Sequence, residues 1–438
     1  MKACILAGGK GTRLKHLFPE TPKCLVPLGG KPILEHQIDL LVSAGIDEIF
    51  LLTGYKGELI QEYFGSGKDQ NATLHYIQET VPLGTAGAFK QLEGKVTEDI
   101  VVLYGDLVLD FDLATLLAFH RKQNALATLV VHPNDHPYDS DLLEINEECD
   151  VLNWYPKNNR ADGIYANLVN AAVYVFRPDI FSWIPKGCTD FGTDIFPSLL
   201  QKNQKLCAYR TSEYIKDMGT EDRWQKASHD FQSGLTARRN LLNPQRAIFL
   251  DRDGTINRDV DLLCDMNQLE LLPRASQAIR QINNSEFLSI CVTNQSVIAR
   301  NLCDLGELQN IHNQLETLLA KDQAYLDHIY FCPHHPDTGY PEERVEYKIN
   351  CECRKPNTGL VLAAQEQYNL DLSRSYIIGD RQEDIQLGKQ LGMVSMLVKT
   401  GREESSEHEW TEAPDFVFPD LELAVHHILN HLEPNKTV

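Results

Sequence analysis

The N-terminal segment carries glycines and a cation of the kind that binds polyphosphates. A short apolar run, residues 2–6, leads into Gly8, Gly9 and Gly11, and Arg13 follows directly. Glycines let backbone N–H groups approach an anion closely, and an arginine adds a bidentate charged donor. The glycines alone fit a simple tight turn equally well. The phosphate-binding interpretation therefore depends on the motifs that accompany them further along the chain.

A second group of charged residues begins far downstream. Asp251 and Asp253 follow an apolar run directly, and a helix cap or a turn would explain such a pair if it stood alone. It is accompanied by Thr293 at the end of another apolar run, by Lys355, and by Asp380 after a third. Residues that follow parallel strands meet at one edge of the sheet, so we expect these five side chains to form one site.

Cysteine and histidine residues form a third group with metal-ligand character. Cys332 and His334 form one short pair, and Cys351 and Cys353 form another. Three thiolates and an imidazole suit tetrahedral Zn²⁺ in a closed structural site, which we favour over unrelated surface cysteines. His335 competes with His334 for the fourth position. The other cysteines are scattered singly through apolar stretches, as expected for reduced thiols.

Alternating strands and helices must position all three groups. The predicted strands are residues 2–6, 48–52, 74–77, 100–103, 247–250, 287–293, 329–331, 376–378 and 394–397. The predicted helices include residues 32–44, 56–64, a segment from 85, 275–283 and 305–321. This alternation is typical of an α/β fold, in which parallel strands are covered by helices and ligands bind at the carboxyl ends of the strands.

The chain is too long for one ordinary hydrophobic core, since 438 residues correspond to two or three domains. A polar, weakly helical stretch near residues 223–245 interrupts the alternation before a new apolar strand begins. We therefore predict a first domain over 1–231, a linker over 232–245 and a second domain over 246–438.

Composition narrows the range of partners. Lys and Arg total 41 against 62 Asp and Glu, which gives a net charge of −21 and disfavours nucleic acid as a partner. Small phosphorylated substrates remain compatible, because Mg²⁺ and a few local cations can hold them. No apolar run approaches the roughly 18–20 residues that span a bilayer, and no signal-peptide core is present. We expect a cytoplasmic protein without a membrane partner, and the sequence leaves the oligomeric state open.

The first half resembles the sugar-1-phosphate nucleotidyltransferases over roughly residues 1–223. The resemblance rests on the glycine loop, on Pro22-Lys23, on residues 83–87 and on Tyr104-Gly105-Asp106, which occur in the family's order. It implies a Rossmann-like (GT-A-like) fold. It also implies that a nucleoside triphosphate contacts Leu6, Ala7, Gly8, Gly9, Gly11, Thr12, Arg13, Lys23, Gly84, Thr85 and Asp106.

The same resemblance implies a reaction without a protein nucleophile. A sugar-1-phosphate oxygen attacks the α-phosphorus in line, so the protein contributes positioning and charge neutralisation. Arg13 and Lys23 would supply cations, and Asp106 and Asp217 would hold Mg²⁺. A departure lies in the sugar region, where many relatives carry Glu-Lys-Pro and then Asn-Ala-Gly.

This chain has Lys157 in a changed context and Asn170-Ala171-Ala172 instead. Lys157 is the candidate for the displaced lysine and Asn170 the candidate sugar contact. An exposed loop lysine and a strand-start asparagine explain the two residues equally well.

The second half resembles the haloacid-dehalogenase superfamily of phosphohydrolases over roughly residues 245–401, which implies a Rossmannoid fold. By this resemblance Asp251 attacks phosphorus, and Asp253 protonates the leaving alcohol and then activates water. Thr293 and Lys355 would hold the phosphoryl oxygens. Asp251, the main-chain carbonyl of Asp253, and Asp380 would hold Mg²⁺. Asp384 would orient Lys355 or a metal-bound water, or be a solvated helix residue.

Within the superfamily the zinc loop narrows the resemblance further. It is similar to that of heptose-1,7-bisphosphate 7-phosphatases and of their relatives, the histidinol-phosphate phosphatases, and that pattern selects His334 over His335. Asn257, Asn294 and Arg354 would then contact substrate. Val297 departs from the pattern, since heptose phosphatases usually have glycine there.

Together the two resemblances imply consecutive reactions. A heptose 1,7-bisphosphate must lose its 7-phosphate before its 1-phosphate can be activated by a nucleotide, whereas histidinol phosphate has no such successor. We predict a bifunctional enzyme of nucleotide-activated heptose synthesis, with GTP favoured by resemblance to heptose-1-phosphate guanylyltransferases. The alternatives are a mannose-1-phosphate guanylyl-, thymidylyl- or uridylyltransferase, a histidinol-phosphate-type phosphatase, or one catalytically silent sugar-phosphate-binding half.

Overall fold

The computed structural model describes residues 1–9, 11–158, 160–339, 343–401 and 411–432. The described residues form two compact units, one of Met1–His132, Tyr138–Arg160 and Leu168–Asn240, the other of Pro133–Pro137, Ala161–Asn167 and Leu241–Val438. The predicted two-domain α/β organisation is confirmed. The bounds 1–231, 232–245 and 246–438 stay predictions, and residues 433–438 of the last range lie outside the described part.

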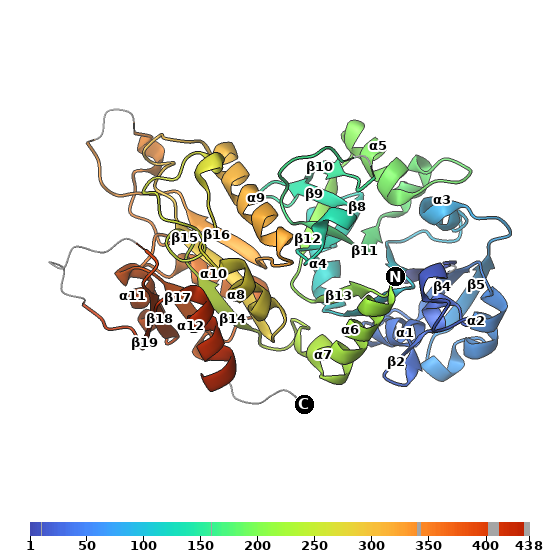
Figure 1. Ribbon diagram of the computed structural model, residues 1–438. Helices are drawn as coiled ribbons and strands as arrows, with labels where there is room; N and C mark the ends of the chain where they lie inside the picture. Colours follow the sequence, from blue (N-terminus) through green and yellow to red (C-terminus); the bar gives the residue numbers. More distant parts are fainter. Residues whose placement is uncertain (10, 159, 340–342, 402–410, 433–438) are drawn as a thin grey trace. The chain divides into compact units, whose positions relative to one another are not determined.

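The first unit is built on parallel strands near the N-terminus (Figure 1). These strands are β1 (Lys2–Ala7), β4 (Glu48–Thr53), β5 (Thr73–Gln78) and β6 (Ile100–Tyr104). β1 pairs in parallel with β4 on one side and with β6 on the other. Ala3, Cys4 and Ile5 are fully buried, as expected for a strand that is central in its sheet. α1 (Ile33–Ser43), α2 (Gly57–Phe64) and α3 (Gly84–Lys90) occupy the connections between strands, near their predicted positions.

The parallel pairing of the predicted strands is confirmed, but the rest of this unit adds antiparallel strands that the sequence analysis did not predict. β11 (Val169–Phe176) runs antiparallel to β6 and to β8 (Ala127–His132). β9 (Leu142–Ile145) and β10 (Val151–Tyr155) also pair antiparallel. Parallel pairing needs a long crossover, usually helical, and no α-helix occurs in the described residues between β8 and β11. The short connections there produce antiparallel neighbours.

A separate antiparallel ribbon joins β7 (Leu107–Asp110) to β13 (Tyr214–Asp217). Its register places Asp217 opposite Leu107, the residue that follows Asp106. The Met218 N–H also donates to the Asp106 carbonyl at 3.1 Å. This pairing brings together two predicted metal ligands that lie far apart in the sequence.

The second unit contains an all-parallel sheet of six strands in the described residues. In spatial order these are β16 (His328–Cys332), β15 (Phe287–Asn294), β14 (Arg246–Leu250), β17 (Tyr376–Gly379), β18 (Val394–Val398) and β19 (Phe416–Phe418). Strands β14 to β18 were predicted, and their parallel pairing is confirmed.

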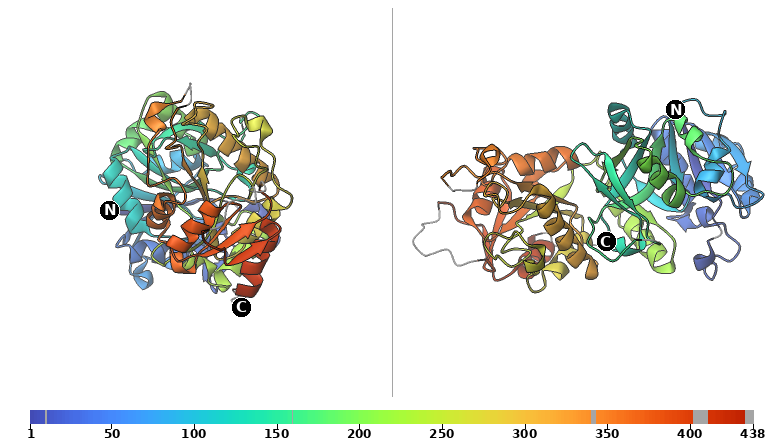
Figure 2. Two further views of the ribbon diagram at one scale, coloured as in Figure 1. Left: turned by 90° about the vertical axis from the view of Figure 1, so that its left-hand side faces the viewer. Right: turned by 90° about the horizontal axis from the view of Figure 1, so that it is seen from above.

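Helices cover both faces of this sheet (Figures 1 and 2). Ile248 and Leu250 of β14 pack into one core cluster, while Ala247 and Phe249 pack into another, because successive side chains of a strand point to opposite faces. The first cluster includes α8 (Ala275–Asn283), α9 (Leu305–Lys321) and α12 (Leu421–His427), and the second includes α10 (Gly359–Tyr368) and α11 (Gln382–Gln390). Residues after β14 therefore lie at the carboxyl end of a fully buried central strand.

The longest helix of this unit, α9, is amphipathic and strongly capped. Asp304 accepts a hydrogen bond from the Glu307 N–H, and the Glu307 side chain accepts one from the Asp304 N–H, a capping box that satisfies both amides. Ile311, Leu315 and Leu319 are buried on its inner face. In the described part of the chain, no helix is both long and apolar enough to cross a membrane.

His312 on the inner face of α9 is a buried imidazole. Its side chain is 3% exposed, and its Nε2 atom has no hydrogen-bond partner among the described residues. Burial and the nearby Arg252 lower its pKa to about 3, although Asp253 opposes the shift. The ordinary histidine pKa is about 6.5, so below that pH the unfolded chain takes up a proton that the folded protein refuses.

We predict that His312 weakens the second unit as the pH falls. Stability rises with pH wherever the unfolded state binds more protons, so this residue should cost about 2 kcal/mol of unfolding free energy between pH 7 and pH 5. A His312→Leu variant should lose less stability over that range by about this amount. The unfolding free energy of the second unit is measured at each pH by urea titration with pulse proteolysis, in which peptides from β14 and β15 report the unfolded fraction of this unit. Parallel pH profiles for the two proteins would contradict the prediction.

Candidate active sites

The glycine loop of the first unit begins where β1 ends. Gly11 has a φ of 57° and precedes a short 3-10 turn over Thr12–Leu14. A Cβ atom at Gly11 would lie 3.1 Å from the Lys23 Cβ atom, so the loop lies directly against Lys23. Only glycine combines this left-handed backbone with such a close approach at low cost. The predicted cation Lys23 and the predicted phosphate loop are therefore neighbours.

Asp106 enters the same region from β6. The Gly105 N–H donates to the Leu6 carbonyl at 3.0 Å, which ties the turn before Asp106 to the end of β1. The Lys23 ammonium forms an ion pair with the Asp106 carboxylate. Gln37 of α1 is buried, and its amide donates to the carbonyls of Tyr104 and Leu107 on either side of this turn. Asp106 is thus held beside the loop by backbone and side-chain contacts.

Asp217 completes the charged part of the site. Burial opposes its ionisation, but the Arg223 guanidinium, the Gly219 N–H and Lys23 outweigh burial and lower the pKa of this carboxyl. The Arg223 Nη1 atom lies 2.7 Å from Asp217 Oδ2, and the Gly219 nitrogen lies 2.8 Å from Oδ1. A Cβ atom at Gly219 would lie 3.2 Å from the Arg13 Nη2 atom. Asp217 therefore stays ionised, with Arg13 and Arg223 close by.

Arg223 is the residue of this site that the sequence analysis did not predict. It lies in the first turn of α6 (Glu221–Gln232) and also pairs with Asp139 at 2.6 Å. The sequence spacing could have indicated this contact. Arg223 lies only six residues after Asp217, and the first turn of a helix that directly follows a strand lies close to the end of that strand. The charged groups Arg13, Lys23, Arg223, Asp106 and Asp217 gather at one place and suit a magnesium-bound polyphosphate.

In the second glycine motif, residues 83–87, Gly84 and Thr85 contact other parts of the same unit. Gly84 has a φ of 74°, and a Cβ atom there would lie 2.3 Å from the Thr189 carbonyl oxygen. The Thr85 hydroxyl donates to Asp190 Oδ2 at 2.6 Å and accepts from the Phe191 N–H at 3.0 Å. These bonds fasten the start of α3 to the segment after residue 188. A nucleotide contact of Gly84 or Thr85 stays a prediction.

The departure in the sugar region has a structural consequence. Ala172 has a φ of 56° at an irregular pairing between β11 and β8, so an alanine occupies a left-handed conformation where the resemblance expects glycine. The Asn170 side chain donates to the Tyr174 hydroxyl at 3.0 Å and accepts from the Ala172 N–H at 3.3 Å. Lys157 is exposed, and its backbone N–H binds Asp141 at 2.9 Å. The roles of Asn170 and Lys157 toward a sugar stay predictions.

In the second unit, Lys355 links two buried carboxylates. Its Nζ atom lies 2.7 Å from Asp251 Oδ1 and 2.6 Å from Asp384 Oδ1, and it donates to the Val292 carbonyl at 2.8 Å. Burial opposes the charge of Lys355, but the coulombic attraction of Asp251 and Asp384 outweighs burial and raises the pKa of Lys355. The lysine is therefore protonated at neutral pH. Asp384 is 1% exposed and is therefore a partner of Lys355 rather than a solvated helix residue.

Asp380 adds a third acid to this cluster. Ligand atoms of Asp251, Asp380 and Asp384 lie within 4.8 Å of one another. Burial, followed by repulsion from Asp251 and Asp384, raises the pKa of Asp380 to about 9. Burial also raises the pKa of Asp384 to about 7, against the opposing charge of Lys355. Lys355 and Arg381, whose Nε atom lies 3.9 Å from Asp380 Oδ2, are two cations beside three buried acids.

The surroundings of Asp380 fit a divalent cation. Its Oδ1 atom is buried and has no hydrogen-bond partner among the described residues. A Cβ atom at Gly254 or at Gly401 would lie 2.3 Å or 1.9 Å from Asp380 Oδ2, so only glycine leaves room at both positions. Oxygen ligands with a deficit of positive charge are the environment that Mg²⁺ prefers.

The other predicted residues lie at the same edge of the sheet, with different contacts. Thr293 is buried and its hydroxyl accepts a hydrogen bond from Gln295 at 2.8 Å. The Asn294 amide pairs with the backbone of Lys355 in both directions, at 2.9 Å and 3.1 Å. Asn257 is fully buried and donates to Asp253 at 2.9 Å. Asn257 and Asn294 thus position catalytic candidates in this structure, and a direct substrate contact by either stays a prediction.

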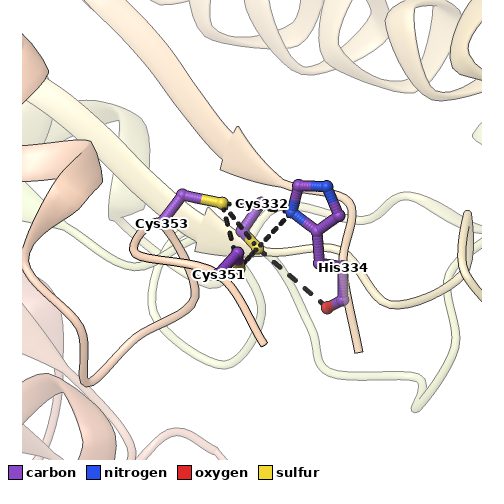
Figure 3. A group of neighbouring side chains, drawn as sticks. All are labelled: Cys332, His334, Cys351 and Cys353. Atoms are coloured by element: carbon purple, nitrogen blue, oxygen red, sulfur yellow. Dashed lines mark hydrogen bonds between the residues drawn. The ribbon is translucent and has the colours of Figure 1, made fainter. Parts of the chain in front are cut away.

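The predicted zinc ligands form one compact group (Figure 3). The Sγ atom of Cys353 lies 3.1 Å from that of Cys332 and 3.3 Å from that of Cys351, and the latter two are 3.5 Å apart. The His334 Nδ1 atom lies 3.2 Å from the Cys353 sulfur. A tetrahedral site with Zn–S distances of about 2.3 Å has ligand separations of about 3.7 Å, so the donor set fits Zn²⁺ after slight expansion.

This cluster joins two segments that deliver active-site residues. Cys332 ends β16, whereas Cys353 directly precedes Arg354 and Lys355. His335 binds elsewhere: its Nδ1 atom accepts the Asp337 N–H at 3.2 Å. The Arg354 guanidinium donates to the His334 carbonyl at 3.2 Å, so its predicted phosphate contact stays a prediction.

Comparisons with known proteins assign each unit to a family. Residues 2–234 match the nucleotidyl transferase family, and residues 352–424 match a family described as HAD-hydrolase-like. The chain is 38% identical over 197 residues to the D-glycero-D-manno-heptose-1,7-bisphosphate 7-phosphatase of Thermosynechococcus vestitus, covering 44% of this chain and 99% of that protein. It is 33% identical over 236 residues to the mannose-1-phosphate guanylyltransferase of Mycobacterium tuberculosis, covering 53% of this chain and 65% of that relative.

A solved structure also matches the second unit. The D,D-heptose 1,7-bisphosphate phosphatase of B. bronchiseptica, complexed with magnesium and phosphate, is 32% identical with a TM-score of 0.37, covering 42% of this chain and 98% of that one. The chain belongs to the nucleotidyl transferase family in its N-terminal part and to the heptose-bisphosphate phosphatase family in its C-terminal part. It is an enzyme with a nucleotidyltransferase domain and a phosphatase domain.

We predict that Lys355 is required for the stability of the phosphatase unit in metal-free buffer. Lys355→Met leaves three buried acids without their lysine, and removing one partner of a buried pair typically costs 3–5 kcal/mol. The unfolding free energy of this unit should therefore fall by roughly 3 kcal/mol. Hydrogen exchange of the β14 and β15 amides measures it. Lys321→Met, at the exposed end of α9, is the control, and equal protection in both variants would contradict the prediction.

Proposed function

We propose that the protein catalyses two consecutive reactions. Its second unit removes the 7-phosphate of D-glycero-D-manno-heptose 1,7-bisphosphate, and its first unit transfers a nucleotidyl group from GTP to the resulting heptose 1-phosphate, releasing pyrophosphate. The observation that carries this proposal is the presence of both families in one chain. A phosphatase that leaves a sugar 1-phosphate produces the acceptor that a sugar-1-phosphate nucleotidyltransferase requires.

In the phosphatase unit, Asp251 is the nucleophile. Its carboxylate attacks phosphorus and the bond from phosphorus to the C7 oxygen breaks. Burial opposes the charge of Asp253, but Arg252, Asn257 and Gln295 outweigh burial and lower the pKa of this carboxyl. Asp253 therefore takes up a proton from solvent in the substrate complex and gives it to the C7 oxygen. Water, deprotonated by Asp253, then cleaves the aspartyl phosphate and regenerates Asp251. Lys355 and Thr293 bind the phosphoryl oxygens. Asp251, Asp380 and the Asp253 carbonyl would hold Mg²⁺, which would supply positive charge that reduces the repulsion between the nucleophile and its substrate.

In the nucleotidyltransferase unit, the chain supplies charge and orientation. The loop with Gly8, Gly9 and Gly11 binds the triphosphate through backbone N–H groups, and Arg13 and Lys23 neutralise its oxygens. Asp106 and Asp217 would hold Mg²⁺, which would supply positive charge to the triphosphate. Lys23, which pairs with Asp106 in this structure, would bind a phosphate oxygen beside them. The acceptor's own phosphate oxygen is the nucleophile, so the protein needs none.

The choice of GTP is supported by the relative that acts as a guanylyltransferase, at 33% identity over 236 residues. Mannose 1-phosphate as the acceptor and thymidylyl or uridylyl transfer are the competing outcomes. A histidinol-phosphate substrate would leave the first unit without an acceptor, which is why heptose bisphosphate is preferred.

The Cys332, His334, Cys351 and Cys353 cluster is a structural zinc site in this proposal. It braces the loop that carries Lys355, so zinc loss should impair phosphate release and leave nucleotidyl transfer intact. We expect about one zinc per chain by mass spectrometry. Cys351→Ser should reduce that content and lower phosphate release about 10–100-fold, whereas Cys188→Ser, at an exposed cysteine outside the cluster, should change neither. Full zinc content in Cys351→Ser would contradict the assignment.

Two reciprocal variants test the two-site proposal. Asp251→Asn should reduce phosphate release from heptose 1,7-bisphosphate by at least ~10³-fold, because the nucleophile is lost, and should spare pyrophosphate release from GTP and heptose 1-phosphate. Asp217→Asn should do the reverse. In each variant, the activity that is retained shows that the unsubstituted unit is still folded. If either substitution removes both activities, the two-site model is wrong.

A further inference from the structure

We propose that Arg252 and Gln295 are positioning residues that hold the Asp253 carboxylate in the orientation from which it serves the leaving alcohol. This inference rests on the proposed phosphatase mechanism, which gives Asp253 its proton-transfer role but leaves the two neighbours without one. Both residues carry polar groups into a buried place, where an apolar side chain would cost less free energy to bury.

Arg252 is the more unusual of the two residues. It is 0% exposed although it follows a strand that ends at the active-site edge. Its guanidinium binds the carboxylate of the neighbouring residue, Asp253. Nη2 lies 2.8 Å from Asp253 Oδ2 and 3.1 Å from Oδ1, and Nε lies 3.2 Å from Oδ1. Burying a guanidinium is expensive unless it is paired, so its site is organised around this carboxylate.

Gln295 forms the second arm of the clamp. Its Nε2 atom donates to Asp253 Oδ2 at 2.9 Å and to the Thr293 hydroxyl at 2.8 Å, and its Oε1 atom accepts from Arg252 Nη2 at 3.0 Å. The Thr293 oxygen thus receives a hydrogen bond from the protein, and its own hydrogen is left for a phosphoryl oxygen. One amide therefore connects the residue that binds the phosphoryl group to the residue that serves the leaving group.

The contacts around Asp253 leave little freedom to rotate. Oδ1 receives bonds from Arg252 and Asn257, and Oδ2 receives bonds from Arg252 and Gln295. The side chain nevertheless retains 19% of its exposure, so it is accessible as well as fixed. Catalytic groups held in one orientation avoid a reorganisation cost in the transition state, and a misplacement of about 1 Å can cost ~10²-fold in rate.

The competing explanation is that Arg252 only stabilises the fold, and a double-mutant cycle separates the two. Phosphate release from D-glycero-D-manno-heptose 1,7-bisphosphate with saturating Mg²⁺ is measured for Arg252→Lys, Asp253→Asn and the double variant. A residue that acts through Asp253 loses its effect once Asp253 cannot transfer a proton. We expect Arg252→Lys to lower kcat about 30-fold with little change in KM, Asp253→Asn to lower it about 10³-fold, and the double variant to match Asp253→Asn within about threefold.

The matched control is Arg246→Lys, because Arg246 is a buried arginine at the opposite end of β14 and pairs with Glu286 at 2.8 Å. It should keep the wild-type kcat. If Arg252→Lys fails to fold, judged by hydrogen exchange in β14 and β15 against this control, Gln295→Met takes its place in the same cycle. This substitution removes the three side-chain hydrogen bonds of Gln295, to Arg252, Asp253 and Thr293, but keeps the length of the side chain.

The outcomes are distinct. Wild-type kcat in Arg252→Lys, or a loss that multiplies in the double variant, overturns the inference and leaves the proposed function standing. Full activity of Asp253→Asn overturns the general-acid assignment, and the inference with it. No phosphate release by the wild-type enzyme overturns the proposed function itself.

Discussion

Repulsion between carboxylates and phosphates is the constraint that shapes both units. In the proposed function each site uses acids to hold a metal beside an anionic substrate, and each places those acids near the ends of strands. In the phosphatase unit Asp251 and Asp384 contact the same lysine ammonium, at 2.7 Å and 2.6 Å. In the nucleotidyltransferase unit Lys23 and Arg223 pair with Asp106 and Asp217. The cations that matter are few and local, which reconciles a net charge of −21 with phosphate chemistry.

The surrounding architecture is organised to keep these charges in place. A parallel sheet with cores on both faces fixes β14, β15 and β17, and the residues after them converge at one edge. The cluster of three cysteines and His334 links the end of β16 to the segment before Lys355. In the other unit, the antiparallel pairing of β7 with β13 brings Asp106 and Asp217 close together. Stability and catalysis therefore depend on the same connections.

Motif spacing and strand periodicity predicted much of this from the sequence. The strands before Gly8, Asp106 and Asp251 and the strand that contains Thr293 lie where expected, because short apolar runs between polar segments indicate strands. The mixed sheet of the first unit was not predicted, since strand direction depends on connections that carry little pattern.

Contacts between side chains were the other feature that the sequence did not predict. Arg223 was missed because a lone arginine on a polar helix looks like solvated surface, and its pairing with Asp217 depends on tertiary structure. The buried contacts of Asn257, Asn294 and Arg252 are equally invisible in sequence, because polar residues are normally exposed and only the folded arrangement shows what they bind.

The most direct test of the account is to follow one substrate through both units. D-glycero-D-manno-heptose 1,7-bisphosphate, as the α- and the β-anomer, is incubated with the wild-type enzyme, Mg²⁺ and each common nucleoside triphosphate, and the products are identified by mass spectrometry. The account predicts that one anomer with GTP yields GDP-heptose, with one phosphate and one pyrophosphate released for each sugar nucleotide formed. A sugar nucleotide formed only with a triphosphate other than GTP, or no turnover of either anomer with any triphosphate, would contradict it.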